Sequence, residues 1–348
     1  MRYLTLFLLV LLLAACGSRG SDTPRTLTVM SHDSFAVSEA VIEAFEEAHN
    51  AQVVLLPSGD TGAALNQAIL AKENPLADLF FGVDNTFMGR ALAAGIFSPY
   101  ESPALADVDP AFQLDPTYRL LPVTYGDVCL NYDVAWFADR GLPPPQSLAD
   151  LADPAYGGLL VVQNPATSSP GLAFLLATIA EFGAEGDYTY LDYWADLRAN
   201  NVLITAGWQD AYYGHFTVAS GGERPLVVSY ASSPPAEVIY ADPPRDTAPS
   251  ASLVAPGMCF RQVEFIGILE GTEARELAEA FVDFALGRTF QEDIPLQMFV
   301  FPVNRTAALP AEFTAWAQIP AQPASIDPAA IEANREAWIE AWTDVVLR

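Results

Sequence analysis

The sequence predicts an α/β fold of two lobes, each a mostly parallel sheet flanked by helices, with crossover strands as the hinge. Short apolar runs typical of strands alternate with amphipathic runs typical of helices along most of the chain. This alternation restarts after Tyr125, which divides it into two units of similar build. The length of 348 residues is enough for two such units.

The first unit has the order of a parallel sheet. Its β-rich runs are Leu27–Met30, Val53–Leu56 and Asp78–Phe81, and apolar residues recur at helical spacing over Val37–His49 and Ala63–Ala71. An alternation of strand and helix in this order predicts parallel strands joined by right-handed crossovers.

The second unit repeats this order and is followed by a third region. Leu159–Val162 and Leu226–Tyr230 are strand-like, and Leu172–Phe182 between them is helical. After a strand-like run from Arg261, helices are expected at residues 272–285 and from Asp327 to the C-terminus. The predicted lobe 1 comprises residues 26–124 plus 260–348, with the C-terminal helices included, and lobe 2 comprises residues 125–259.

The charge of the chain excludes several classes of partner. Asp and Glu number 43 against 16 Lys and Arg, giving a formal net charge of −27. Nucleic acids and anionic membrane surfaces bind basic proteins, so neither is an expected partner. Most of the acids are expected on a solvated surface, but the negative field also favours a cationic ligand. Disorder is not expected, because 51% of the residues are hydrophobic.

The first residues predict export. Arg2 is followed by the apolar run Leu4–Leu13 and then by small residues ahead of Cys16, a pattern that resembles a bacterial lipoprotein signal. We therefore expect residues 1–15 to be a signal peptide and Cys16 to be the lipid anchor. Residues 16–25 are expected to form a lipidated tether. The predicted location is the periplasm or an extracytoplasmic membrane face.

Cys129 and Cys259 are the other two cysteines of the chain, and each lies in a strand-like run. In an oxidising compartment they could form one disulfide, or both could be buried free thiols. Neither has another cysteine or a histidine at the spacing of metal ligands, so no metal site is expected.

Polar residues follow the strands at four strand-to-helix junctions. In an open α/β sheet ligands bind beyond the carboxyl ends of the strands, and helix N-termini offer free N–H groups there. Any one junction could be simple helix capping, but four of them, two in each unit, predict a cleft between the lobes. The residues concerned are Ser31, Asp33 and Ser34; Ser58, Asp60 and Thr61; Thr167, Ser168 and Ser169; and Ser232 and Ser233.

No catalytic constellation is recognisable in the sequence. The histidines are His32, His49 and His215, and no serine-hydrolase elbow, zinc-protease motif or nucleotide-binding glycine loop occurs. We expect a binding protein rather than an enzyme, with no cofactor.

Six motifs, spread in order over the predicted mature chain, resemble the thiamine-binding subfamily of the periplasmic solute-binding proteins of ABC importers. The motifs are Asp33-Ser-Phe35, Gly82-x-Asp84-Asn85, Thr167-Ser-Ser-Pro-Gly-Leu172, Gly207-Trp208-x-x-Ala-Tyr212, Ser229-Tyr230-x-Ser-Ser-Pro234 and Arg335-x-Ala-Trp338-x-x-x-Trp342. The resemblance implies a two-lobed periplasmic-binding-protein fold of type II. It also implies that the chain binds thiamine or its phosphate esters in the inter-lobe cleft.

The family's ligand-binding positions fall on residues of both predicted lobes. The resemblance implies that Trp208 and Tyr230 stack on the rings of the ligand and that Asp60 pairs with its amino group or its thiazolium. It also implies that the hydroxyls of Ser168 and Ser169 bind the hydroxyethyl or phosphate end of the ligand. Three positions differ from relatives: Thr61 stands where they have glycine, His32 where they have tyrosine, and Phe299 where they have tryptophan. The expected ligand-binding residues are Asp60, Thr61, Ser168, Ser169, Trp208, Tyr230, His32, Asp33, Asp84 and Ser233.

The resemblance also implies partners and a transport function. The protein is expected to be a monomer that delivers its ligand to an ABC permease driven by an ATPase subunit. One alternative is ferric-iron binding through the adjacent pair Tyr212 and Tyr213. An exported hydrolase is the alternative of a different class, although no nucleophile–base pair supports it.

Overall fold

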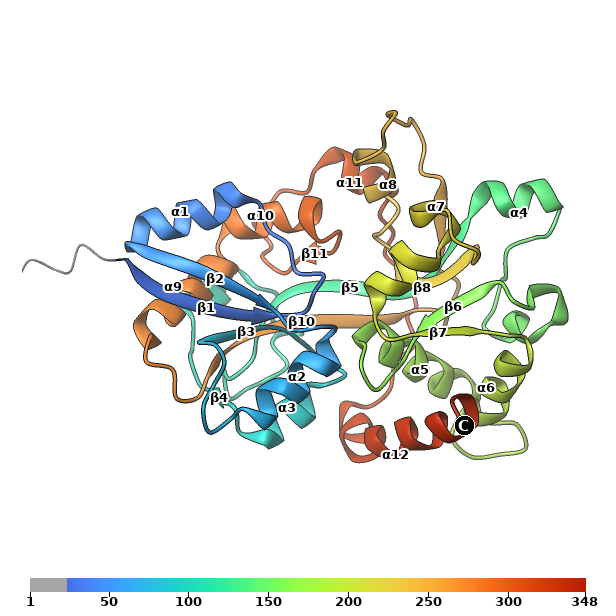
Figure 1. The fold of residues 1–348 in the computed structure, drawn as a ribbon, viewed down its shortest axis with the longest axis horizontal. Helices are drawn as coiled ribbons and strands as arrows, with labels where there is room; N and C mark the ends of the chain where they lie inside the picture. The colour runs from blue at the N-terminus through green and yellow to red at the C-terminus, as the bar shows by residue number, and fades with distance from the viewer. Residues whose placement is uncertain (1–23) are drawn as a thin grey trace, which may run out of the picture.

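The computed structural model describes residues 24–348, so the predicted signal peptide and the Cys16 anchor lie outside the described residues. It has the mixed α/β fold expected, with strands and helices gathered into two bodies (Figure 1). One hydrogen-bonded sheet runs through both bodies in the order β2-β1-β3-β10-β5-β8-β6-β7. Within residues 24–348, no helix combines the length and hydrophobicity needed to cross a bilayer.

The centre of lobe 1 is the group of parallel strands β2, β1 and β3, which helices cover on both faces. Alternate residues of β1 and β3 face opposite sides: Leu27 and Phe81 pack with α1, α9 and α10, whereas Met30 and Phe80 pack with α2 and α3. The elements are β1 (Arg25–Ser31), α1 (Glu39–His49), β2 (Ala51–Pro57), α2 (Thr61–Leu70), β3 (Leu79–Asp84), α3 (Met88–Ala94), β4 (Phe97–Ser98), α9 (Arg275–Leu286), α10 (Arg288–Gln297) and β11 (Phe301–Pro302).

Lobe 2 is built around the buried helix α5, which packs on the sheet together with α6. Strand β6 pairs in parallel with both β7 and β8. The elements are α4 (Val134–Arg140), β6 (Leu160–Gln163), α5 (Ser169–Phe182), α6 (Tyr190–Ala199), β7 (Leu203–Thr205), the π-helix η5 (Asp210–His215), α7 (Thr217–Ser220), β8 (Leu226–Tyr230), α8 (Ala236–Ile239) and β9 (Ser250–Leu253).

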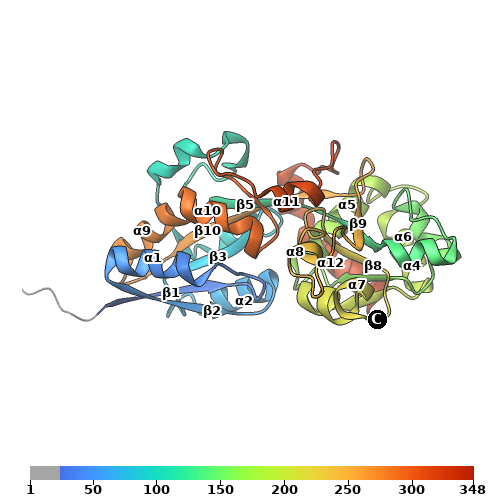
Figure 2. The ribbon, with the colours of Figure 1, turned by 90° about the horizontal axis from the view of Figure 1, so that it is seen from above.

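Two long antiparallel strands, β5 (Leu121–Asp133) and β10 (Phe260–Leu269), join the lobes (Figures 1 and 2). The first half of β5 pairs with β10, and its second half pairs with β8 and β9 of lobe 2. Strand β10 continues in the other direction and pairs with β3 of lobe 1. A relative movement of the lobes must therefore bend these two strands.

A disulfide joins Cys129 of β5 to Cys259, the residue before β10. Close by, Arg261 donates to both carboxylate oxygens of buried Asp127, at 3.0 and 2.8 Å. The hinge strands are thus joined by a covalent bond and a bidentate ion pair in addition to their backbone ladder.

Replacing both cysteines by serine is expected to lower the free energy of unfolding by about 2–4 kcal/mol, because the disulfide restricts the unfolded chain. Urea unfolding measures the loss, and the wild-type protein treated with a reductant should lose a similar amount. Peptide mapping without reductant should yield a peptide that links the two cysteines. Recovery of both as free thiols would contradict the disulfide.

The C-terminal helix α12 (Pro328–Val346) contacts both lobes, which corrects the expectation that residues 260–348 belong wholly to lobe 1. Its Arg335 lies over the Phe87 ring of lobe 1 at 5.1 Å. Its Trp342 packs edge-on against Trp194 of α6 in lobe 2, with ring centroids 5.4 Å apart. The sequence shows that this helix has an apolar face, but not which lobe that face packs against. The short helix α11 (Ala311–Trp316) precedes it.

Candidate functional site: the inter-lobe cleft

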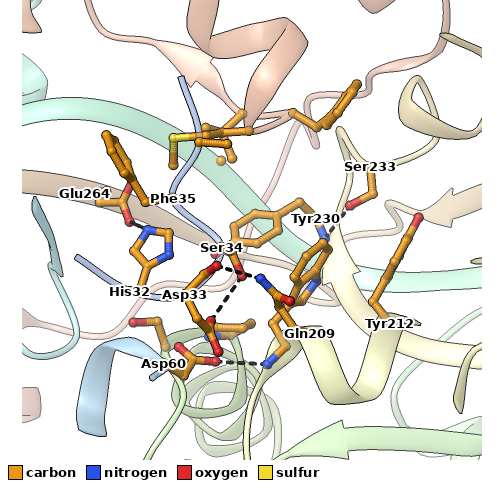
Figure 3. A pocket seen from close by; sticks show the side chains of 18 of the residues that line it. His32, Asp33, Ser34, Phe35, Asp60, Gln209, Tyr212, Tyr230, Ser233 and Glu264 are labelled. Atoms are coloured by element: carbon orange, nitrogen blue, oxygen red, sulfur yellow. Dashed lines mark hydrogen bonds and ion pairs between the residues drawn. The ribbon is translucent and has the colours of Figure 1, made fainter. Parts of the chain in front are cut away.

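A cavity of about 260 Å³ lies between the lobes, beside the hinge strands (Figure 3). Its walls come from the loop after β1, the start of α2, the start of α5, the segment after β7 and the end of β8. The end of α10 and the residues that follow it, 297–300, complete the lining. The volume is just below the usual range for small-molecule sites, so the cavity suits a compact ligand.

The cavity is acidic. Asp33, Asp60 and Glu264 line it, and none of its lining residues is Lys or Arg. His32 is the one lining residue that can become a cation within the ordinary pH range. This set of charges favours a ligand that carries a positive charge.

Asp60 joins the two lobes at the floor of the cavity. Its side chain accepts from the backbone N–H of Thr61 at 2.7 Å, which caps α2, and from the backbone N–H of Trp208 in lobe 2 at 2.9 Å (Figure 3). Burial raises the pKa of Asp60, and the Trp208 hydrogen bond opposes that rise. Thr61 also lines the cavity, but its hydroxyl donates to the carbonyl of Gly82 at 3.0 Å.

Trp208 and Tyr230 form an aromatic wall. The Trp208 ring stacks on Tyr212 with centroids 4.9 Å apart, and its indole N–H donates to Ser229 Oγ at 2.9 Å. Tyr230 lies against β5 at Gly126, where an added Cβ would approach the ring to 2.8 Å. These contacts hold both rings in place before a ligand arrives. Phe299 also lines the cavity.

Two other predicted site residues line the cavity but are already hydrogen-bonded within the protein. The buried Ser233 hydroxyl lies 2.9 Å from Ser229 Oγ. Asp33 is exposed, and its backbone carbonyl accepts from Gln209 Nε2 in lobe 2 at 2.6 Å. This last bond joins lining residues of the two lobes.

Asp84 and Ser168 lie outside the cavity wall. Asp84 is fully buried and accepts a hydrogen bond from the Ser169 hydroxyl at the start of α5, while Ser169 itself does line the cavity. Asp84 also accepts from the backbone and hydroxyl of Thr86 at 2.7 and 2.6 Å. The structure therefore gives Asp84 a contact between the lobes, and leaves Ser168 buried behind the wall.

Burial raises the pKa of Asp84 to about 6, although hydrogen bonds from Ser169 and Thr86 oppose the rise. Because the folded state binds this proton more tightly than the unfolded state, the stabilising contribution is full below about pH 4 and is lost as pH rises through about 6. Relative to Asp84→Asn, the wild-type protein should lose about 3 kcal/mol of unfolding free energy between about pH 4 and 7.5.

Urea unfolding of both proteins across this pH range measures the difference, with Asp139→Asn on the exposed face of α4 as the control. Parallel pH profiles for wild type and Asp84→Asn would show that Asp84 does not carry this proton.

The hinge strands supply site residues that sequence reasoning missed. Glu264 and Thr124 line the cavity, and the Thr124 hydroxyl donates to Glu264 at 2.9 Å. Gln262 also lines it and accepts from the Tyr230 hydroxyl at 3.2 Å. Glu264 had one sequence signal: it is the only charged residue in the run Val263–Leu269, which is otherwise free of polar side chains.

Both tyrosines of the iron alternative line the cavity, but Tyr212 is already hydrogen-bonded within the protein. Tyr212 is buried, and its hydroxyl donates to Glu237 at 2.6 Å. Across residues 24–348, no group of three or more His, Cys, Asp and Glu side chains is arranged to hold a metal ion.

The family model described as bacterial extracellular solute-binding protein matches residues 74–320. The chain belongs to this family. A solute-binding protein transports its ligand rather than transforming it, and the cleft between two hinged lobes is where such a ligand is enclosed. The expected class of fold and function is thereby confirmed.

Comparison with individual proteins gives closer relatives of this solute-binding protein. The thiamine-binding periplasmic protein of Salmonella typhimurium is 31% identical over 97% of the chain and 98% of the relative. That of Escherichia coli is 31% identical over 92% and 94%. A solved structure described as a periplasmic thiamin binding protein has a TM-score of 0.82 and 29% identity, covering 94% and 99%.

Iron-binding relatives are more distant. The Fe(3+)-binding periplasmic protein of Serratia marcescens is 21% identical over 81% of this chain and 79% of its own. The structure of iron-bound HitA from Pseudomonas aeruginosa has a TM-score of 0.73 at 21% identity, covering 92% of this chain and 99% of that one, which is a likeness of fold.

Proposed function

We propose that this solute-binding protein binds thiamine in its inter-lobe cleft and delivers it to an ABC permease and its ATPase. The proposal rests on one observation: the cavity is acidic, has no Lys or Arg in its lining, and has an aromatic wall. Thiamine carries a permanent thiazolium charge and two aromatic rings, which match these two features. Relatives that bear the thiamine-binding name over nearly the whole chain support the same ligand.

Different side chains of the cavity are expected to recognise different parts of thiamine. Trp208 and Tyr230 offer faces on which the rings can stack, and a cation over an aromatic face gains about 0.5–2 kcal/mol. Asp60 offers carboxylate lone pairs to the amino group of the pyrimidine or to the thiazolium charge. Because Asp60 also holds the backbone of Trp208, it couples ligand binding to closure of the lobes.

We further propose that unphosphorylated thiamine is preferred over its phosphate esters. The start of α5 is the natural place for a phosphate, but buried Asp84 already accepts from Ser169 there. A phosphate would also lie among Asp33, Asp60 and Glu264 without a lysine or arginine partner.

Competition for bound thiamine, followed by tryptophan fluorescence, tests this order of ligands. Thiamine diphosphate is expected to compete at least about tenfold less well than thiamine, in line with like-charge repulsion in a closed cavity. Equal competition by the diphosphate would contradict the proposed preference while leaving thiamine binding intact.

The location and assembly follow from the same proposal. We propose that Cys16 carries the lipid anchor on an extracytoplasmic membrane face, and that a monomer with closed lobes docks on the permease. Mass spectrometry of the membrane-extracted protein should find a lipid-modified Cys16 at the mature N-terminus. An unmodified N-terminus at another residue would contradict the anchor.

A further inference from the structure

His32 stands in the cavity wall as a side chain that the proposed function does not use. It follows β1 directly, is 8% exposed, and lines the cavity. Its Nε2 lies 2.9 Å from Glu264 Oε1, and Figure 3 shows the imidazole between Glu264 and the interior of the cavity. Glu264 is in turn held by the Thr124 hydroxyl.

Two contacts fix the orientation of the ring. A Cβ on Gly82 would lie 2.5 Å from His32 Cδ2, so the Cδ2 edge packs on the backbone of β3. The Nε2 corner lies 2.9 Å from Glu264 Oε1, an ion-pair contact without the alignment of a hydrogen bond. A hydrogen on Nε2 avoids repulsion between two lone pairs at this distance. The Nδ1 edge is left for the cavity, and a neutral His32 presents a lone pair there.

We propose that His32, positioned by Glu264, is a specificity-determining residue whose protonation opposes the binding of a cationic ligand. In its neutral form Nδ1 can accept a hydrogen bond from a ligand N–H group. In its protonated form Nδ1 becomes a donor, and the ring adds a positive charge to the wall of the cavity. Both changes disfavour a cation, so binding of the cation must expel the proton.

The surroundings of His32 set the pH at which this occurs. Burial lowers the pKa of His32, but the neighbouring Glu264 carboxylate and then Asp60 and Asp33 raise it, and the net change is a rise above the ordinary value. The charged and titratable groups that face His32 or lie just beyond Glu264 are Glu264 of β10, Asp60 at the start of α2, Asp33 after β1, Asp84 at the end of β3 and Tyr230 of β8. His32 therefore keeps its proton to a higher pH than an ordinary histidine does.

This inference rests on thiamine as the ligand of the proposed function, and it predicts the sign of the pH dependence. The affinity of the wild-type protein for thiamine should rise by about tenfold between about pH 5.5 and 8.5, since one positive charge leaves the cavity wall. Burial raises the pKa of Asp60, and it raises the pKa of Asp84 to about 6, so deprotonation of these carboxyl groups with rising pH acts in the same direction. The contribution of His32 is therefore the difference between the wild-type protein and His32→Gln.

Calorimetry at about pH 7 in two buffers of different ionisation enthalpy measures the protons released per thiamine bound. The wild-type protein is expected to release a fraction of a proton, and His32→Gln is expected to release markedly less. Equal proton release by both proteins would overturn the inference. If the wild-type protein binds no thiamine at all, the proposed function fails instead, so the two failures are distinguishable.

Proton NMR titration of the histidine rings follows the protonation of His32 in the wild-type protein itself. The chain has only three histidines, and His32 is assigned by its absence from the spectrum of His32→Gln. Saturation with thiamine should lower the pKa of His32 by about one, the counterpart of a tenfold change in affinity. Glu264→Gln should lower the pKa of His32 in the free protein, which identifies Glu264 as the positioning residue. An unchanged His32 titration in the presence of thiamine would overturn the inference.

Discussion

Trp208→Ala is expected to weaken thiamine binding by about 30- to 100-fold, which corresponds to about 2–3 kcal/mol. The change removes a ring that is held in place from three directions, by Tyr212 beneath it, Ser229 at its N–H and Asp60 at its backbone. Rings that are rigid before binding lose little entropy when they stack, so removing such a ring loses most of the binding free energy of the stacking contact.

Isothermal calorimetry measures this loss, and two variants make it specific. Trp208→Phe keeps an aromatic face and should lose about threefold to tenfold, an intermediate value for a smaller ring without the N–H. Trp136→Ala is the matched control, because Trp136 lies on α4 outside the cavity, where Arg140 covers its ring at 4.0 Å. Unchanged affinity in Trp208→Ala would contradict the aromatic wall.

Trp342→Ala is expected to lower the free energy of unfolding by about 3–5 kcal/mol, because a fully buried indole is replaced by a cavity. Trp342 packs against Trp194 of lobe 2, on the helix that also places Arg335 over Phe87 of lobe 1. Loss of this contact should weaken the packing of α12 against both lobes.

Urea or thermal unfolding measures the effect. Trp342→Phe should cost less than half as much, because it keeps most of the buried area and the indole N–H has no partner among the described residues. Trp338→Ala changes a partly buried tryptophan of the same helix and should also cost less. Equal losses for Trp338→Ala and Trp342→Ala would contradict the assigned role of the buried ring.

The alternation of strands and helices was readable from the sequence because β1, β3 and β6 are short apolar runs and α5 is a long one. The long strands β5 and β10 were also visible as strand-like runs. Their role as shared strands of one sheet depends on long-range pairing that periodicity does not encode. The contacts of α12 with both lobes were not predicted for the same reason, because an apolar helix face does not indicate which surface it packs against.

The candidate site was predicted best where residues stand at strand-to-helix junctions or carry large aromatic rings. Asp60, Trp208 and Tyr230 all line the cavity. Asp84 was misplaced, because a polar residue after a strand can face either the cleft or the neighbouring helix, and here it reaches α5. Glu264 was missed, because the face of β10 that meets the cavity follows from the register with β5.

The central claim is that the inter-lobe cleft binds thiamine, and calorimetric titration of the delipidated protein with thiamine tests it most directly. The account predicts one site per chain with a dissociation constant below about 10 μM, or more than about 6.8 kcal/mol of binding free energy. It also predicts that Asp60→Ala and Trp208→Ala each weaken that site. A wild-type protein that binds no thiamine below about 10 μM, in a preparation shown to be folded and free of bound ligand, would contradict the account.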